Sequence, residues 1–258
     1  MSVKLVKIEI PYLDQKVNAI GFLPDPAKPT KDGLAILTHG YTSHKASILN
    51  WPTRLVEEGL PAILFDLPGH FLGGFSEVYD FELFKTEAPK LFQKAYELMK
   101  EHITLTDNSP IVLGGHSLGS LLCLKAMESD FFKSKNTKAV CVGLGLPPEG
   151  VTHIFDTPFY KSTLVIREQL VSKALGPKIV FPWIKEEKEN MDISGHRIHF
   201  ITGEDDLVVG KDGTERFAKI LERHGNQVTV EKPTKLGHHL PEMAAGYVKK
   251  YLKSEGII

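Results

Sequence analysis

The chain has 258 residues, and its 31 Lys and Arg residues nearly balance its 32 Asp and Glu residues, which gives a formal net charge of -1. This balance offers no electrostatic basis for binding nucleic acid, and the length suits one sizeable α/β domain with a full hydrophobic core. No apolar run has the length of a membrane span, and the cysteines, Cys123 and Cys141, fall in segments typical of small buried side chains, so we expect no disulfide and a cytoplasmic location.

The apolar pattern predicts strands that alternate with helices along most of the chain. Residues 1–10 alternate apolar and charged side chains, which is typical of a strand rather than of a secretory leader. The predicted strands cover residues 3–10, 17–23, 34–39, 61–66, 110–115, 138–144, 197–202 and 227–231. The predicted helices cover residues 47–58, 81–102, 118–129, 214–224 and 241–253. The later part has the strand-helix-strand rhythm of a mostly parallel sheet.

The most informative segment runs from Ile111 to Gly119, where a short apolar stretch ends in Gly-x-Ser-x-Gly. The residues before this motif favour a strand, and those after it favour a helix without proline. A serine at such a strand-to-helix turn has a strained backbone, and Gly115 and Gly119 are needed where a side chain would collide with the neighbouring strand or helix. The motif therefore predicts that Ser117 projects its hydroxyl into a cleft as a nucleophile.

A serine hydroxyl is a poor nucleophile near neutral pH, so it needs a histidine base and a carboxylate that orients the base. Both residue types follow Ser117 in the chain. Residues 197–209 predict a buried strand that runs into the acidic stretch Glu204-Asp205-Asp206. The stretch Gly237-His238-His239 follows the last predicted strand. The sequence thus supplies a serine, an acid and a histidine in that order.

Through these motifs the chain resembles the α/β-hydrolase family over nearly its whole length. In that family the acid usually falls three residues after the glycine that ends its strand, and the histidine directly follows a glycine. The resemblance therefore selects Asp206 over Asp205 and His238 over His239, so that Ser117, Asp206 and His238 are the predicted catalytic residues. Asp205 is otherwise a solvated loop acid or a helix cap, and His239 is a lining residue beside the base. The implied fold is α/β, with a mostly parallel eight-stranded sheet flanked by helices.

The predicted strand at residues 34–39 ends in His39-Gly40, and Tyr41-Thr42-Ser43-His44-Lys45 follow. In the family, the loop after this strand gives one amide of the oxyanion hole, and the residue after the nucleophile gives the other. The resemblance therefore implies an oxyanion hole formed by the backbone N–H groups of Tyr41 and Leu118. The run from His39 to Lys45 also resembles a segment of bacterial cinnamoyl and feruloyl esterases, a subgroup of small carboxylesterases.

Roughly forty residues lie between the Pro147-Pro148 pair and the predicted strand at Arg197, which is longer than an ordinary connection. The segment is rich in apolar and aromatic residues, and the resemblance implies that it forms a small cap inserted before the strand that carries the acid. We therefore assign residues 1–146 and 191–258 to the hydrolase core and residues 147–190 to the cap. Unless they form the cap's own core, the residues expected to line an acyl or aryl pocket are Phe155, Phe159, Tyr160, Phe181 and Trp183.

These residues together predict a serine hydrolase that cleaves carboxylic esters of short or medium acyl chains, or of compact aryl acids, through an acyl-enzyme intermediate. The same triad also fits hydrolysis of a thioester, a lysophospholipid or a C–C bond, and acyl transfer, and a more distant alternative is a non-catalytic protein that binds a small ligand. We expect no cofactor and no metal, since no metal-ligand spacing accompanies the histidines. The expected partner is a small-molecule ester, without nucleic acid or integral membrane association, and a homodimer is left open.

Overall fold

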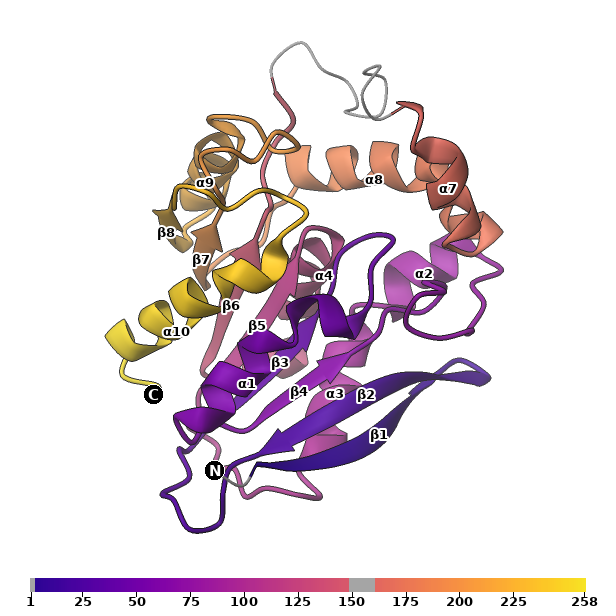
Figure 1. The fold of residues 1–258 in the computed structure, drawn as a ribbon. Coiled ribbons are helices and arrows are strands. Elements are labelled where there is room, and N and C mark those ends of the chain that lie inside the picture. Colours follow the sequence, from indigo (N-terminus) through magenta and orange to yellow (C-terminus); the bar gives the residue numbers. More distant parts are fainter. Residues whose placement is uncertain (1–2, 149–160) are drawn as a thin grey trace.

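The computed structural model describes residues 3–148 and 161–258, which are built around one eight-stranded sheet (Figure 1). Across the sheet the strand order is β1-β2-β4-β3-β5-β6-β7-β8. The strands are β1 (Lys4–Tyr12), β2 (Gln15–Leu23), β3 (Leu34–Thr38), β4 (Ala62–Phe65), β5 (Ile111–His116), β6 (Thr137–Val142), β7 (Arg197–Ile201) and β8 (Gln227–Glu231). The prediction of eight strands is confirmed, with boundaries that move by two residues or fewer.

The sheet is parallel from β4 across to β8, and only β2 runs against its neighbours β1 and β4. Every residue of β3, β4, β5 and β6 is buried, as expected for central parallel strands with helices on both faces. Strand β1 instead alternates exposed and buried residues along its second half, because one of its faces meets solvent. The predicted mostly parallel α/β sheet is thus confirmed.

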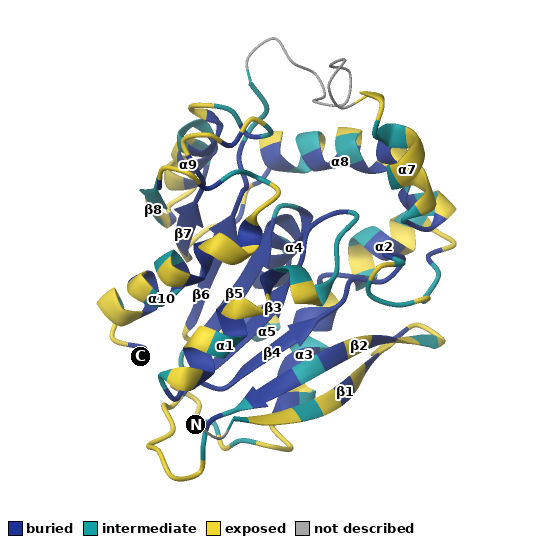
Figure 2. Ribbon diagram, in the orientation of Figure 1, coloured by how far each residue is buried: buried dark blue, intermediate teal, exposed yellow. Residues whose placement is uncertain are grey.

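Helices cover both faces of the sheet. Because successive strand residues point to opposite faces, Ile36 joins one core cluster and Leu37 the other. Helices α1 (Asn50–Glu57) and α10 (Ala245–Ser254) pack on the face of Leu37, whereas α3 (Lys90–Met99), α4 (Leu118–Met127) and α9 (Gly213–Arg223) pack on the face of Ile36. Figure 2 shows the result as buried strands between helices whose buried and exposed residues alternate.

The helix predicted over residues 81–102 is divided in the structure. It forms α2 (Phe81–Glu87) and α3, and Pro89 lies between them. A proline has no N–H to donate to the preceding turn, so an uninterrupted helix is disfavoured at this point. The shorter elements are α5 (Asp130–Lys133) and two 3-10 turns, η1 (Lys45–Ile48) and η4 (Pro241–Ala244), which precede α1 and α10.

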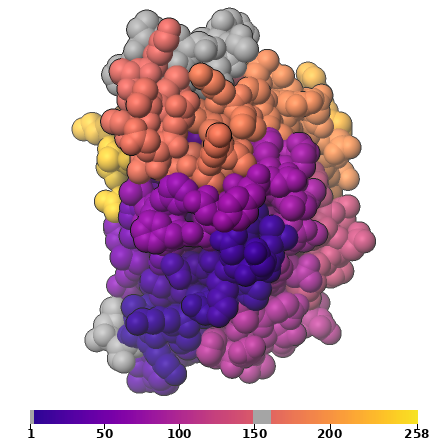
Figure 3. Space-filling view, turned by 90° about the vertical axis from the view of Figure 1, so that its right-hand side faces the viewer, coloured from indigo at the N-terminus to yellow at the C-terminus, as the bar shows by residue number. Residues whose placement is uncertain are grey.

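The described part of the predicted cap, residues 161–190, passes over the end of the sheet where β5 and β6 finish (Figure 1). It contains α7 (Leu164–Gln169), η3 (Lys173–Leu175) and α8 (Pro177–Glu189). Two backbone hydrogen bonds fasten it to the loop after β4, from Phe71 N–H to Leu170 O and from Ser172 N–H to Gly69 O, both at 2.9 Å. Figure 3 shows this segment, in salmon and orange, seated on the purple residues that follow β4. Its treatment as a separate cap with boundaries at 147 and 190 stays a prediction.

Among the helices in the described parts of the chain, none is both long and apolar enough for a membrane crossing.

Candidate active site

Ser117 stands at a sharp turn between β5 and α4. Its backbone has φ 51° and ψ -112°, a left-handed conformation that costs a non-glycine residue about 1–3 kcal/mol. The turn is tight because β5 and α4 nearly touch. A Cβ at Gly115 would overlap the backbone of Gly119, and a Cβ at Gly119 would overlap the carbonyl oxygen of His39. The two glycines therefore allow the turn to form, and the turn directs the Ser117 side chain outward.

Hydrogen bonds of Ser120 stabilise this turn. Its hydroxyl is buried, donates to Gly115 O at 2.5 Å and accepts from Val142 N–H at 3.0 Å. The N–H of Ser117 also donates to Val142 O, at 2.8 Å. These bonds tie the turn to the end of β6 and fix the place from which Ser117 projects.

Two loops at the same end of the sheet bring an imidazole and a carboxylate to Ser117. His238 lies in the loop after β8, and its Nε2 is 3.2 Å from Ser117 Oγ. Asp206 lies in the loop after β7, and its Oδ2 is 2.8 Å from His238 Nδ1. The structure therefore brings the three predicted catalytic residues into one hydrogen-bonded chain.

The choice between the neighbouring acids has a structural basis. Asp206 is 3% exposed, whereas Asp205 points to solvent. The second carboxylate oxygen of Asp206 accepts the N–H groups of Val208 and Val209, at 2.9 and 3.0 Å. Burial alone would raise the pKa of Asp206, but the His238 imidazole and the Val209 N–H outweigh burial and hold the pKa below its ordinary value. The carboxylate is therefore ionised near neutral pH and fixed in direction.

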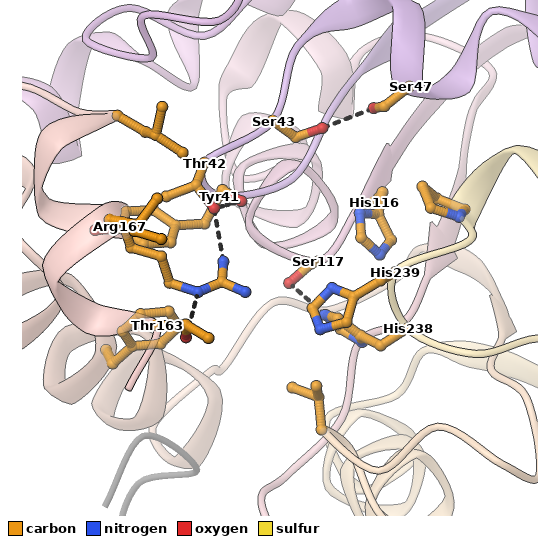
Figure 4. Close-up of a pocket in the computed structure, with 15 residues that line it drawn as sticks. Tyr41, Thr42, Ser43, Ser47, His116, Ser117, Thr163, Arg167, His238 and His239 are labelled. Atoms are coloured by element: carbon orange, nitrogen blue, oxygen red, sulfur yellow. Dashed lines mark hydrogen bonds between the residues drawn. The ribbon is translucent and has the colours of Figure 1, made fainter. Parts of the chain in front are cut away.

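His116 packs against the ring of His238, with ring centroids 4.9 Å apart. Burial, together with the neighbouring His238, lowers the pKa of His116 to about 3, so the ring stays neutral in the working pH range. A neutral neighbour would not oppose a positive charge on the His238 ring. His239 is exposed on the other side and lines the cleft (Figure 4).

The loop after β3 is held in place by groups on β4 and its loop. His39 accepts the N–H of Leu67 at Nε2 (2.9 Å), and its Nδ1 is 2.8 Å from Gly40 O. The buried carboxylate of Asp66 accepts the backbone N–H of Lys45 at 2.7 Å and also pairs with the Lys45 ammonium. These contacts fix the backbone that carries Tyr41, one of the two predicted oxyanion donors.

Tyr41 also joins this loop to the segment above it. Its hydroxyl donates to Leu175 O at 2.7 Å, and its ring meets Phe181 edge-on at 5.0 Å. The other predicted donor, Leu118, is the first residue of α4, where a backbone N–H has no acceptor within the helix. Tyr41 and Ser117 line the same cleft.

The cleft has a volume of about 410 Å³, within the range of small-molecule sites. Figure 4 shows Ser117, His238 and His239 on one side and Arg167, from α7, on the other. Arg167 donates to Thr42 Oγ1 at 2.7 Å and to Thr163 Oγ1 at 3.2 Å, so its guanidinium is held across the cleft from Ser117. The lining comprises Tyr41, Thr42, Ser43, Ser47, His116, Ser117, Thr163, Ile166, Arg167, Leu170, Phe181, Val208, His238, His239 and Pro241.

The predicted pocket residues from the cap separate into three groups. Phe181 lines the cleft. Trp183 does not reach it: the indole is 5% exposed, packs edge-on against Phe81 and Phe84, and donates to Glu187, because it faces the helix layer rather than the opening. Phe155, Phe159 and Tyr160 lie outside the described residues.

Sequence reasoning did not single out Asp66, Ser120 or Arg167 for this site. Asp66 had one available signal, since it is the last residue of the strand predicted at 61–66, at the end of the sheet where ligands gather. Ser120 and Arg167 had none, because the partner that ties each to another element, Val142 for Ser120 and Thr42 for Arg167, is more than twenty residues away in the chain. Within residues 3–148 and 161–258, no group of three or more His, Cys, Asp and Glu side chains is placed to hold a metal ion.

Comparison with known proteins agrees with this architecture. The sequence model described as the alpha/beta hydrolase family matches residues 35–227. A thermostable carboxyl esterase from Bacillus coagulans is similar with a TM-score of 0.71 at 14% identity, over 99% of each chain. An esterase from Pyrobaculum calidifontis gives a TM-score of 0.69 at 14% identity, over 99% of this chain and 87% of its own. A lidless serine hydrolase from Xanthomonas campestris gives 0.64 at 14% identity, over 99% of this chain and 96% of its own. No curated protein matches the sequence.

Proposed function

The chain belongs to the alpha/beta hydrolase family, and on that premise we propose that it is a serine carboxylesterase acting on short or medium acyl esters or esters of compact aryl acids. One observation carries the proposal. The hydrogen-bonded chain from Asp206 through His238 to Ser117 ends at a serine that faces a cleft of small-molecule size. A serine needs this arrangement to become a nucleophile near neutral pH.

In the proposed first step, Nε2 of His238 takes the proton of Ser117 while Oγ attacks the ester carbonyl carbon. The carbonyl oxygen becomes an oxyanion, which the N–H groups of Tyr41 and Leu118 stabilise. The ionised carboxylate of Asp206 keeps the His238 proton on Nδ1 and stabilises the imidazolium. Collapse of the intermediate breaks the bond to the alcohol oxygen, which receives the proton from His238.

In the second step, His238 takes a proton from water, and the resulting hydroxide attacks the acyl-Ser117 carbonyl. The tetrahedral intermediate expels the serine oxygen, which regains its proton, and the acid product leaves. No group beyond these side chains, the two amides and water is required. The apolar lining of the cleft by Ile166, Leu170, Phe181 and Val208 favours an acyl chain or a compact ring rather than a large polar substrate.

The test is hydrolysis of p-nitrophenyl esters of graded acyl length and of methyl ferulate by wild type and Ser117→Ala. We expect wild type to favour the shorter chains, and we expect the variant to lose at least about 1000-fold in kcat/KM. The matched control is Ser134→Ala, because Ser134 is an exposed serine whose hydroxyl only meets Phe131 O. A fluorophosphonate probe should label wild type and Ser134→Ala but not Ser117→Ala.

The alternatives give different results in the same experiment. Labelling of Ser117 without ester turnover would move the assignment to thioester, lysophospholipid or C–C substrates, or to acyl transfer. The absence of both labelling and turnover would overturn the proposal and would favour a protein that binds a small ligand without catalysis.

A further inference from the structure

A second, smaller cavity shares Ser117, Phe181, Val208 and His238 with the cleft but is not lined by Arg167. Its volume is about 70 Å³, several times the ~10–15 Å³ that one water requires, so it can hold a chain of a few heavy atoms. Ser117 and His238 form one end of it, and Lys188 from α8 lies in its wall. The lining comprises Ser117, Gly143, Leu144, Gly145, Pro147, Phe181, Ile184, Lys185, Lys188, Val208, Val209 and His238.

Lys188 is a buried cation in this wall. The residue is 8% exposed, and its ammonium donates to Gly145 O at 2.5 Å. An ammonium has three N–H donors, and Gly145 O uses one of them. No carboxylate in the described parts of the chain lies within ion-pair distance of Lys188, whereas Lys185, also on α8, pairs with Glu189 at 3.4 Å. The ammonium therefore has donors to offer to a bound group.

A structural role alone does not account for a lysine at this position. Val180, Trp183, Ile184 and Lys188 share the buried face of α8. An apolar side chain of similar length would fill the same space without the cost of removing an ammonium from water, and would give up only the one bond to Gly145 O. Burial lowers the pKa of Lys188 to about 8, which is the sign of that cost. An anion bound beside the ammonium would offset it.

We propose that the Lys188 cavity is a carboxylate-binding subsite, so that the preferred substrates are small esters that carry a carboxylate a few atoms from the ester bond. This inference rests on the proposed esterase function and names its substrate class. The ester carbonyl lies at Ser117, and the carboxylate reaches the Lys188 ammonium through the small cavity. The carboxylate belongs either to the acyl part, as in a half-ester of a dicarboxylic acid, or to the alcohol part, as in an ester of a hydroxy acid.

The experiment compares each charged ester with a neutral ester of the same shape. For the acyl part the pair is monomethyl succinate and methyl isocaproate, and for the alcohol part it is the acetate ester of β-hydroxypropanoate and isoamyl acetate. Proton release in a pH-stat gives kcat/KM for wild type, Lys188→Met and the control Lys178→Met. Methionine keeps the length of the lysine stem and removes its charge. The control removes a charge from the same helix at Lys178, an exposed residue that lines neither cavity.

We expect wild type to prefer the charged member of one pair, and the member preferred tells which part of the ester carries the carboxylate. Lys188→Met should lose about 10- to 100-fold in kcat/KM on that ester, because the loss of a hydrogen bond to a charged group typically costs about this factor. Its activity on the neutral partner should stay within about two-fold of wild type, and Lys178→Met should stay near wild type on both.

Equal losses on the charged and neutral esters in Lys188→Met would mean that Lys188 only supports the fold and would overturn the inference. The wild-type preference is a second criterion that does not depend on the variant folding, and a wild type that treats both members of each pair alike would also overturn it. The esterase function would survive both results, because the neutral esters would still be cleaved in a Ser117-dependent manner. Loss of all Ser117-dependent cleavage would instead remove the esterase function, and the inference with it.

Discussion

Asp206 is expected to act through the direction in which it holds the proton of His238. One oxygen accepts two backbone N–H groups, from Val208 and Val209, and the other meets His238 Nδ1. In Asp206→Asn the amide oxygen should keep the place beside the two N–H groups, because the amide nitrogen can only donate there. The NH₂ group then faces His238 Nδ1, which must be unprotonated in order to accept a hydrogen bond from it.

The proton of His238 then sits on Nε2 and points at Ser117, so the ring cannot act as a base. Reversing the amide would set its donors against two buried N–H donors, at about 1–3 kcal/mol for each unsatisfied group, or about 2–6 kcal/mol in all. At about 1.36 kcal/mol per factor of ten, the expected loss of kcat/KM is about 30- to 25,000-fold. The range includes the roughly 10,000-fold loss of kcat known for the same change in a serine protease.

The assay is hydrolysis of p-nitrophenyl butyrate by wild type, Asp206→Asn and the control Asp205→Asn, each checked for folding by circular dichroism. Asp205 is exposed, so its variant should stay within about two-fold of wild type. Wild-type activity in Asp206→Asn, or an equal loss in Asp205→Asn, would refute the reasoning.

Two further predictions concern stability. Tyr41→Phe removes the hydroxyl that donates to Leu175 O but keeps the ring that packs on Phe181. Urea denaturation should therefore show a free energy of unfolding that is lower by about 1–3 kcal/mol. An unchanged free energy of unfolding would contradict the role given to this hydroxyl. Burial lowers the pKa of His70 to about 4 and, with His238 nearby, that of His116 to about 3, both below the ordinary 6.5. As the pH falls below 6.5, these two rings bind protons in the unfolded chain but not in the native state. Each ring should therefore lower the free energy of unfolding by about 2 kcal/mol between about pH 7.5 and pH 5. Equal unfolding free energies at the two pH values would show that these rings titrate in the native state.

Most of the architecture could be predicted because it follows from local patterns. The apolar runs of β3 and β5 indicate buried strands, and the glycines on both sides of Ser117 indicate the tight turn. The preference for Asp206 over Asp205 came from spacing alone. The structure supplies a physical basis for it, since Asp206 N–H bonds to Gly203 O and its side chain points inward. The three residues meet as expected, and their catalytic roles stay predictions.

The positions in the cap segment could not be predicted in the same way. Phe181 and Trp183 are two residues apart and equally aromatic, but one lines the cleft and the other packs on α2. Which side of α8 faces the cleft depends on how the helix lies across the sheet end. That placement is set by contacts with the distant loop after β4.

The sequence by itself determined the order of strands and helices, the turn at Ser117 and the residue types that could activate it, because each of these depends on neighbours within a few positions. Only the tertiary structure decided that Arg167 and Lys188 line two different cavities, both of which Ser117 also lines. The reason is that a side chain's surroundings in a folded core are set by packing between elements that are far apart in the chain. A lysine in a helix has the same local pattern whether it meets solvent or, as Lys188 does, a buried carbonyl beside the nucleophile.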